Sequence, residues 1–320
     1  MLKYLILHLD DTSVSFCHYT NTNYESKLIN IETLKKALLW SMKENLSVQV
    51  VYPDYELPMD YKHILCNIDH TNVVSSKNRD CLLRKNADVV VFNSIPELIG
   101  YSYINEQAYI IRTSLENLFE DYGIICENFQ MMSRINIIIT DVHKFDQEAQ
   151  LEYKNVLSKL SDIAAINYKK GQYIQLNILT DILFLDKMNN CNAGVEHVTV
   201  APDGNFYVCP AFYLDSHDSK ALGSLASGLD IKNPQLYKRE YAPICRLCDA
   251  NQCKRCIWLN RKMTLEVNTP SHEQCVMAHM ERNQSRELIA DIRKFGVFMP
   301  EKKIPSLDYL DPFDKILEKK

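Results

Sequence analysis

Four cysteines within twelve residues constrain this chain more than any other feature. Their spacing is Cys245-x2-Cys248-x4-Cys253-x2-Cys256. A C-x-x-C pair turns the chain back on itself, so its two thiolates can converge on one metal. Three basic residues stand within the same run, which is not the composition of an apolar core. The run therefore predicts a thiolate-bound metal.

The eleven cysteines of the 320-residue chain are unevenly distributed. Seven fall between Cys191 and Cys275, and this region adds Cys191, Cys209 and Cys275 to the run. The other four are Cys17, Cys66, Cys81 and Cys126. The start of the chain has neither the basic residues nor the small-residue cleavage site of a signal peptide, so we predict a cytoplasmic protein. Clustered thiols in a reducing cytoplasm indicate metal binding rather than disulfides.

Composition and charge exclude several classes of partner. Lys plus Arg is 36 and Asp plus Glu is 41, giving a net charge of -5, which offers no electrostatic basis for tight nucleic-acid binding. No apolar run approaches the roughly 20 residues that cross a bilayer, so we expect no membrane partner. With eight glycines, the chain contains no glycine-rich phosphate loop.

The thiol spacing leaves the metal open. Zinc prefers one closed tetrahedron of four ligands, usually with a longer spacer between its two C-x-x-C pairs. Iron–sulfur clusters also take four cysteines, and in two-cluster proteins the last cysteine of a tight run can ligate the other cluster. Seven thiols suit two clusters with one incomplete ligand set, whereas one zinc would leave three thiols over. The spacing favours iron–sulfur, with zinc as the alternative.

The first half of the chain alternates apolar runs of strand length with helical patterns. Strands separated by helices indicate βαβ units and a mainly parallel α/β sheet. The number of units fits a partial (β/α) barrel better than a closed eight-fold one, and a doubly wound sheet fits the periodicity equally well. The predicted helices are 31–45, 114–128 with Ser114 as N-cap, and 144–168. The predicted strands are Lys3–Leu9, Ser47–Tyr52, Ile64–Asp69, Asp88–Asn93, Ala108–Arg112, Arg134–Thr140 and Tyr173–Ile178.

The regular alternation stops near Met188. A hairpin is predicted where HVTVA and FYVC flank Pro202-Asp203-Gly204-Asn205, because this tetrapeptide supplies a fixed φ, a capping side chain and residues that tolerate positive φ. A last helix is expected at Glu287–Phe295, and the segment from Pro300 onward reads as an extended tail that packs on a surface or a partner. We therefore divide the chain into a partial barrel (1–187), a Cys-rich domain (188–288) and a C-terminal helix with a tail (289–320).

The Cys-rich domain resembles the SPASM domain of radical SAM enzymes that modify peptides and proteins. The similarity rests on CNAGVEHVTVAPDGNFYVCPAFY, then ALGSL, then CRLCDANQCKRC, then Cys275, and it covers residues 188–288. Such domains typically carry two auxiliary iron–sulfur clusters. The resemblance implies an outer cluster held by Cys245, Cys248, Cys253 and Cys275, and an inner cluster held by Cys191, Cys209 and Cys256.

The sequence departs from that family pattern in two places. The family has G-x4-C after the hairpin, whereas here Gly223 is followed at that distance by Gly228. The run is spaced x2, x4, x2 rather than x2, x5, x3. A fourth inner ligand is therefore either absent, which leaves an open iron site, or is an oxygen or His217.

The first half resembles a degenerate radical SAM barrel. A radical SAM enzyme needs C-x3-C-x2-C after its first strand, and this chain has no such motif. At that place stand Cys17, then Asn21, then Tyr24. One cysteine cannot hold the cluster, so we expect no S-adenosylmethionine on this chain, and the alternative for Cys17 is a buried thiol.

A fuller resemblance is to the CXXX repeat peptide maturases, which have a SPASM-like C-terminus and a segment similar to LNRKMTLEVNTPSHEQCVMAHMERNQS. This resemblance implies a role in maturation of a ribosomally synthesised Cys-repeat peptide. Our leading hypothesis is a partner of a true radical SAM enzyme that binds the precursor peptide, acts as a scaffold or transfers electrons. The alternatives are a zinc-stabilised scaffold without redox chemistry and a stand-alone peptide-modifying enzyme that uses an open iron.

Some further polar residues carry weaker hypotheses. His197, His272 and His279 flank the cysteines and could ligate metal, although satisfied or exposed histidines are the commoner case. Asp10 and Asp11 follow the first strand, where βα barrels place functional groups, so they could bind a cation or a peptide amine. A solvated loop is the alternative for these two residues.

Overall fold

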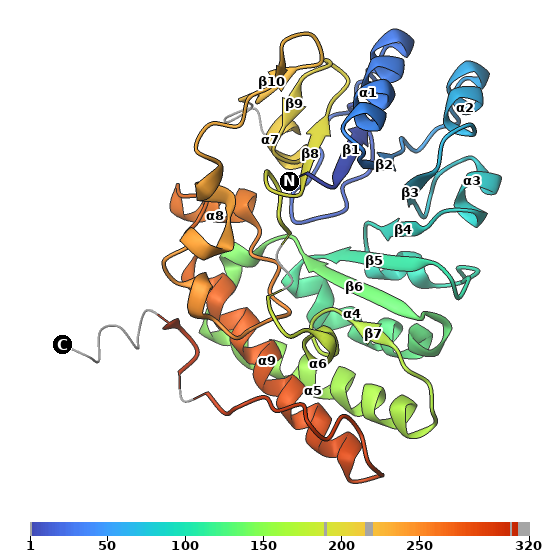
Figure 1. Ribbon diagram of the computed structural model, residues 1–320. Helices are drawn as coiled ribbons and strands as arrows, with labels where there is room; N and C mark the ends of the chain where they lie inside the picture. The colour runs from blue at the N-terminus through green and yellow to red at the C-terminus, as the bar shows by residue number, and fades with distance from the viewer. Residues whose placement is uncertain (1, 189–190, 215–219, 308, 313–320) are drawn as a thin grey trace. The chain divides into compact units, whose positions relative to one another are not determined.

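The computed structural model describes residues 2–188, 191–214, 220–307 and 309–312, and Figure 1 shows the ribbon. The chain divides into two compact units, each made from two stretches of sequence. The first unit is Met1–Val91 with Asn192–Tyr241, and the second is Phe92–Cys191 with Ala242–Lys320. The run of four cysteines lies in the second unit.

The first unit is built on a mainly parallel sheet. Its strands lie in the order β4-β3-β2-β1-β8-β9. Neighbouring strands run parallel, except for the antiparallel hairpin of β8 and β9. The bounds are β1 Tyr4–His8, β2 Ser47–Val51, β3 His70–Ser75, β4 Val89–Phe92, β8 His197–Val200 and β9 Phe206–Tyr207. A small hairpin pairs β10 (Gly223–Ser224) with β11 (Gly228–Leu229).

Burial explains why the first unit forms these elements. Leu5 and Leu7 of β1 are fully buried, and so is Val50 of β2. The runs are continuous in apolar residues because both faces of the parallel strands are covered. Helix α1 (Ile31–Lys43) packs on β1 and β2, and its first turn is capped by Asn30, whose side chain accepts from the Glu32 N–H.

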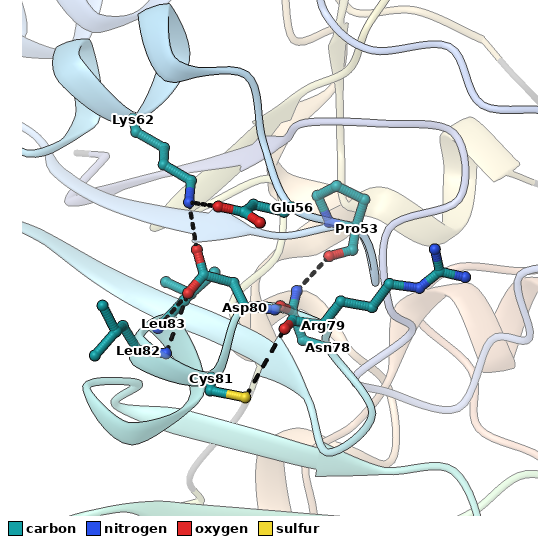
Figure 2. A network of polar contacts seen from close by, with 9 residues as sticks. All are labelled: Pro53, Glu56, Lys62, Asn78, Arg79, Asp80, Cys81, Leu82 and Leu83. Carbon is teal, nitrogen blue, oxygen red and sulfur yellow. Dashed lines mark hydrogen bonds and ion pairs between the residues drawn. The ribbon is translucent and has the colours of Figure 1, made fainter.

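A polar network fixes two short helices of the first unit, α2 (Met59–Leu65) and α3 (Cys81–Lys85). Asp80 caps α3 by accepting hydrogen bonds from the N–H groups of Leu82 and Leu83, both at 3.1 Å. The Lys62 ammonium on α2 donates to Asp80 at 2.6 Å and to Glu56 at 2.5 Å (Figure 2). The network therefore has a structural role, because capping and helix attachment account for each of these contacts.

The second unit combines a parallel sheet with long helices. Its strands β5 (Ala108–Thr113), β6 (Arg134–Ile139) and β7 (Gln175–Leu176) run parallel in the order β7-β6-β5. Helix α5 packs against both α4 and α9, so α9 is anchored along the unit. The helices are α4 Leu115–Asn128, α5 Gln147–Lys169, α6 Asp181–Phe184, α8 Ile257–Thr264 and α9 His272–Arg293.

The mainly parallel α/β organisation predicted from the sequence is confirmed, and so are most of its elements. Ser114 caps α4 as expected, by accepting from the Asn117 N–H at 3.2 Å. The predicted hairpin forms, with Gly204 at a φ of 79° in its turn. No helix within the described residues has the length and apolar character that spanning a membrane requires.

Two predicted elements are wrong in position. The strand expected at Ile64–Asp69 is instead the end of α2 and the turn that follows it, and β3 begins at His70. Ile64 and Leu65 belong to a helical turn, and the buried strand core is Val73 and Val74. The last helix starts at His272, well before the expected Glu287, because Ser271 opens it with a capping box.

Candidate metal centre

Four of the predicted ligands lie together in the second unit. We call Cys245, Cys248, Cys253 and Cys275 the outer thiol group. Cys245 packs with Cys248 and Cys253 beside Met188 and Ala242. Cys275 lies close enough to the other three that their charges act on it. The structure thus brings together the residues predicted to hold the outer cluster.

Local hydrogen bonds shape the loop that carries three of these thiols. Cys245 opens a 3-10 turn, and the Cys248 N–H donates back to its carbonyl at 3.3 Å. The Ala250 N–H then points at the Cys248 Sγ at 3.5 Å, and the Cys253 N–H donates to the Ala250 carbonyl at 3.0 Å. The loop therefore folds back on itself, as a C-x-x-C metal turn requires.

Helix α9 supplies the fourth thiol of the group and holds the loop in place. Cys275 lies in the first turn of α9, and its N–H donates to the Ser271 carbonyl at 3.2 Å. The Gln252 amide, next to Cys253, donates to the Ala278 carbonyl at 2.6 Å. This bond fixes the loop against α9, so Cys253 and Cys275 share one region.

Burial makes two thiols of the outer thiol group, Cys253 and Cys275, hard to ionise in the absence of a cation. Cys245 is 5% exposed and Cys275 is 8% exposed. Burial raises the pKa of the Cys253 and Cys275 thiols far above the usual range, and neighbouring thiolates of the group raise it further. A positively charged centre would reverse this balance, because it compensates for the repulsion among thiolates. Thiols in this environment would therefore be held as thiolates only beside a positive charge.

Polar side chains of α9 surround the outer thiol group. His279 Nε2 lies 3.5 Å from the Cys248 Sγ, and its Nδ1 contacts the Leu310 carbonyl. Arg282, which has no exposed surface, donates to Asp249 with its Nε at 2.9 Å from Oδ1. These side chains hold the Cys-rich loop from the helix side.

A buried carboxyl lies on the same helix. Burial raises the pKa of Glu281 to about 7, although hydrogen bonds from Tyr153 and Gln252 act in the opposite direction. The Tyr153 hydroxyl donates to it at 2.7 Å. Glu281 thus links α5 to α9 behind the thiols.

The predicted inner ligands are divided between the two units. Cys191 and Cys256 belong to the second unit, where the Cys191 N–H donates to the Lys254 carbonyl at 2.8 Å. Cys256 stands at the N-cap of α8, and burial together with the charge of Cys191 raises the pKa of its thiol to about 12. Cys209 belongs to the first unit, where it follows β9 and is half-buried.

Other predicted ligands have other contacts or lie outside the description. His217, the candidate fourth ligand, lies outside the described residues. The His272 Nδ1 pairs with Asp311 rather than with a cysteine. No disulfide joins any of the described cysteines. Within the described ranges, no three His, Cys, Asp or Glu side chains form a group that could hold a metal ion.

The loop after β1 does not present three ligand positions. The Asn21 side-chain amide donates to the Asp11 carbonyl at 2.7 Å and to the Ser13 carbonyl at 2.9 Å, so this residue closes the loop. Tyr24 is 94% exposed and Cys17 is half-buried. The three residues at the degenerate motif thus occupy three different environments.

Asp10 and Asp11 have structural partners in the first unit. The buried Asp10 carboxylate accepts from Ser26 at 2.8 Å and from Tyr55 at 2.9 Å, and also from Thr12. Asp11 accepts a hydrogen bond from the Tyr213 hydroxyl. The solvated-loop alternative is therefore wrong for Asp10, which is fully buried and ties together the loops that follow β1 and β2.

Sequence reasoning named His279 but missed two other polar residues of α9 near the thiols, Glu281 and Arg282. The signal was present, because Cys275, His279 and Arg282 recur at spacings of four and three and so share one face of a helix. Arg282 and Glu281 were not recognised as neighbours of the centre. A helix predicted only from Glu287 onward could not reveal that face.

The fold of this chain resembles that of solved structures of anSMEcpe. Native anSMEcpe with bound AdoMet and Cp18Cys peptide matches with a TM-score of 0.56 and 12% identity, over 92% of this chain and 100% of that chain. Native anSMEcpe with bound AdoMet matches with a TM-score of 0.54 and 14% identity, over 90% of this chain and 99% of that chain. No protein-family model and no curated protein matches the sequence. At these identities the likeness establishes the fold.

Proposed function

We propose that this chain is an iron–sulfur protein that takes part in maturation of a ribosomally synthesised Cys-repeat peptide. Its role is that of a partner to a radical SAM enzyme, which would supply the radical. This chain would bind the peptide, hold the partner or pass electrons. We infer that it carries one or two clusters, and that zinc is the alternative metal.

The main support for the proposal is the grouping of four thiols in the second unit. Four thiols from two separate segments, 245–253 and α9, gather in one buried region of a chain that has the fold of a radical SAM/SPASM peptide maturase. As thiolates these four groups would repel one another, so holding them ionised together requires a positively charged centre. Iron–sulfur clusters take four such ligands.

The resemblance to the SPASM domain assigns residues to two centres. Cys245, Cys248, Cys253 and Cys275 would hold the outer cluster. Cys191, Cys209 and Cys256 would hold the inner one, with its fourth position open or filled by an oxygen or His217. A bound cluster would supply one-electron storage and transfer. The chain's own residues bury the thiols, orient them through backbone N–H groups and hold the loop on α9.

The loop after β1 supports an accessory role. Its degenerate motif holds one cysteine, the Asn21 amide is engaged with backbone carbonyls, and Tyr24 points to solvent. The residues there therefore stabilise the loop itself. We infer that S-adenosylmethionine is bound by the partner and not by this chain.

The peptide partner is inferred from the neighbouring structures. One of the matched structures holds a Cp18Cys peptide, and this chain covers the full length of that protein. A protein with the same fold and a buried thiol centre is suited to the same class of substrate. The resemblance to the CXXX repeat maturases narrows that class to Cys-repeat precursors.

Metal analysis of anaerobically purified protein tests the proposal. We expect about four to eight irons per chain with matching sulfide. Cys253→Ser and Cys275→Ser should each lower the iron content by about four. Cys66→Ser and Cys81→Ser, which change exposed cysteines of the first unit, are matched controls and should keep the wild-type content. A chain that holds only zinc would overturn the iron–sulfur assignment.

A zinc-stabilised scaffold is the second candidate, because a structural zinc site also takes four thiolates. In such a site the four sulfurs stand at about 2.3 Å from one ion. X-ray absorption at the zinc and iron edges identifies which metal is bound. Colour gives a second test, since a zinc scaffold would be colourless and stable in oxygen.

Co-expression tests the peptide role. The chain is expressed with neighbouring gene products, captured under anaerobic conditions, and any bound Cys-rich peptide is weighed by mass spectrometry. We expect a radical SAM protein or a precursor peptide to be retained. Modification of the peptide by this chain alone would instead support the stand-alone enzyme.

A further inference from the structure

The end of the chain returns along the helix that carries Cys275. We call the described residues 297–307 and 309–312 the C-terminal strap. After α9 ends at Arg293, the strap runs beside that helix towards its start (Figure 1). Residues further along the strap contact residues nearer the start of α9. Arg293 donates to the Lys302 carbonyl, Arg282 donates to the Pro305 carbonyl, and His272 pairs with Asp311. The strap is therefore antiparallel to α9.

Apolar packing anchors the first part of the strap. Phe298, Met299 and Ile304 pack on a buried cluster of Ile182, Leu183 and Ile289. The Lys302 ammonium donates to the Leu185 carbonyl at 2.6 Å, and Arg293 donates to the Phe298 carbonyl at 3.0 Å. This part is fixed by both burial and hydrogen bonds, so it serves as an anchor.

The last part of the strap lies on the outer thiol group. His279, which faces the Cys248 Sγ with its Nε2, contacts the Leu310 carbonyl with its Nδ1. The Tyr309 ring stands edge-on to the His279 imidazole, with the ring centroids 5.8 Å apart. Asp311 is 4% exposed and lies close enough to Cys275 for its charge to act on that thiol.

We propose that the C-terminal strap is a releasable cover over the outer thiol group, which controls how fast solutes reach Cys245, Cys248, Cys253 and Cys275. The anchor keeps the strap attached, and the end at 309–312 opens. The cover acts on thiols whichever metal they hold, so the inference goes beyond the proposed function and does not depend on iron.

The difference between anchor and end explains why one opens before the other. The anchor packs three partly buried apolar side chains on a buried cluster, whereas the end contacts α9 through polar and aromatic groups that include His272 and His279. The His272 side chain is 54% exposed, so water competes directly for its contact with Asp311. Local opening takes place where apolar contacts are few and hydrogen bonds reach the solvent.

Site-resolved alkylation of the metal-free, reduced full-length chain tests the cover. The reagent is N-ethylmaleimide, and peptide mass spectrometry follows each cysteine separately. Tyr309→Ala and Asp311→Ala should raise the labelling rates of Cys248 and Cys275 by about tenfold or more, because they increase the open fraction. Lys303→Ala and Ser306→Ala, at exposed positions of the strap, are the matched controls and should leave those rates unchanged.

Two other cysteines serve as internal references in the same samples. Cys81 is exposed in the first unit, and Cys126 is half-buried on α4 of the second unit. Both should keep their wild-type rates in the Tyr309 and Asp311 variants. If Cys248 and Cys275 are labelled at the same rates in the variants as in the wild type, the proposal is overturned. A parallel rise at Cys126 would also overturn it, because that result reports loosening of the whole unit.

Asp311→Asn provides a second variant that preserves the size of the side chain. It should give an intermediate labelling rate, since an amide oxygen can still accept from His272 without the ionic contribution. A rate equal to that of the wild type in all three variants would exclude the cover even if one variant folds poorly. Because the chain is metal-free throughout, this result is independent of the iron and sulfide analysis.

Discussion

The imidazole Nε2 of His279 lies 3.5 Å from the Sγ of Cys248, although 31 residues separate them in sequence. The other ring nitrogen contacts the Leu310 carbonyl, so one side chain links the Cys-rich loop, helix α9 and the strap. Without a metal, this arrangement allows the Cys248 S–H to donate to Nε2 while the Nδ1 N–H donates to Leu310. His279 therefore holds a predicted ligand in place by its position.

The His279→Ala variant should destabilise the metal-free chain by about 1–2 kcal/mol, because it removes both contacts from a largely buried site. His279→Asn should recover about half of that loss, since its amide N–H reaches the position of Nδ1. Urea unfolding of the three proteins measures the difference. Identical stability of the Ala and Asn variants would show that the Leu310 contact contributes nothing.

The loop after β1 should depend on Asp10 far more than on Asp11. The Asp10 carboxylate accepts from Thr12, Ser26 and Tyr55 and is fully buried. Asp10→Asn replaces one accepting oxygen by a donor and should cost about 2–3 kcal/mol. Asp11→Asn keeps an oxygen for the Tyr213 hydroxyl and should cost less than about 1 kcal/mol. Equal losses in urea unfolding would contradict this division of roles.

The strands were predictable where burial dictates the residue type. Ser47–Tyr52 and Arg134–Thr140 are rich in β-branched residues because both faces of a parallel strand are covered. The Tyr173–Ile178 prediction was too long, since β7 pairs only at Gln175–Leu176. Beyond that point the Asn177 side chain bonds both the N–H and the carbonyl of Ile137 and replaces the backbone ladder. A side chain that makes the hydrogen bonds of a strand backbone does not change the hydrophobic periodicity of the sequence, so the end of β7 could not be predicted.

The thiols could be predicted from spacing, but their surroundings could not. C-x-x-C turns are local, so sequence alone indicated a thiol group within 245–256. The strap acts on this region partly through the main-chain carbonyls of Pro305 and Leu310, which accept from Arg282 and His279. Every residue type carries such a carbonyl, so these contacts leave no trace in the sequence.

His8 should make the chain sensitive to acid. Burial lowers the pKa of His8 to about 4, and neither ring nitrogen has a hydrogen-bond partner among the described residues. Since the folded pKa lies below the unfolded value of 6.5, stability from this group is complete above pH 6.5 and is lost as pH falls towards 4. The loss amounts to about 3 kcal/mol, because each pKa unit corresponds to about 1.4 kcal/mol.

The His8→Leu variant tests this effect through urea unfolding at pH 7.5, 6 and 5. It should match or exceed the wild-type stability at pH 7.5, because it removes two unpaired buried nitrogens, and its advantage should grow as pH falls. His63→Gln, at an exposed histidine of α2, should run parallel to the wild type. A constant gap between His8→Leu and wild type across this pH range would show that His8 does not titrate as described.

The capping box of α9 should position Cys275 as well as stabilise the helix. Ser271 Oγ accepts from the Gln274 N–H at 3.3 Å, and the Gln274 side chain accepts from the Ser271 N–H at 3.1 Å. Ser271→Ala should cost about 1 kcal/mol in urea unfolding and increase alkylation of Cys275 in the metal-free chain, because the first turn frays. Ser271→Thr keeps the hydroxyl and should stay close to wild type in both measurements. Ser114→Ala removes the cap of α4, so it should lose similar stability without changing the labelling of Cys275. If the Ala and Thr variants label Cys275 at the same rate, the cap does not place this thiol.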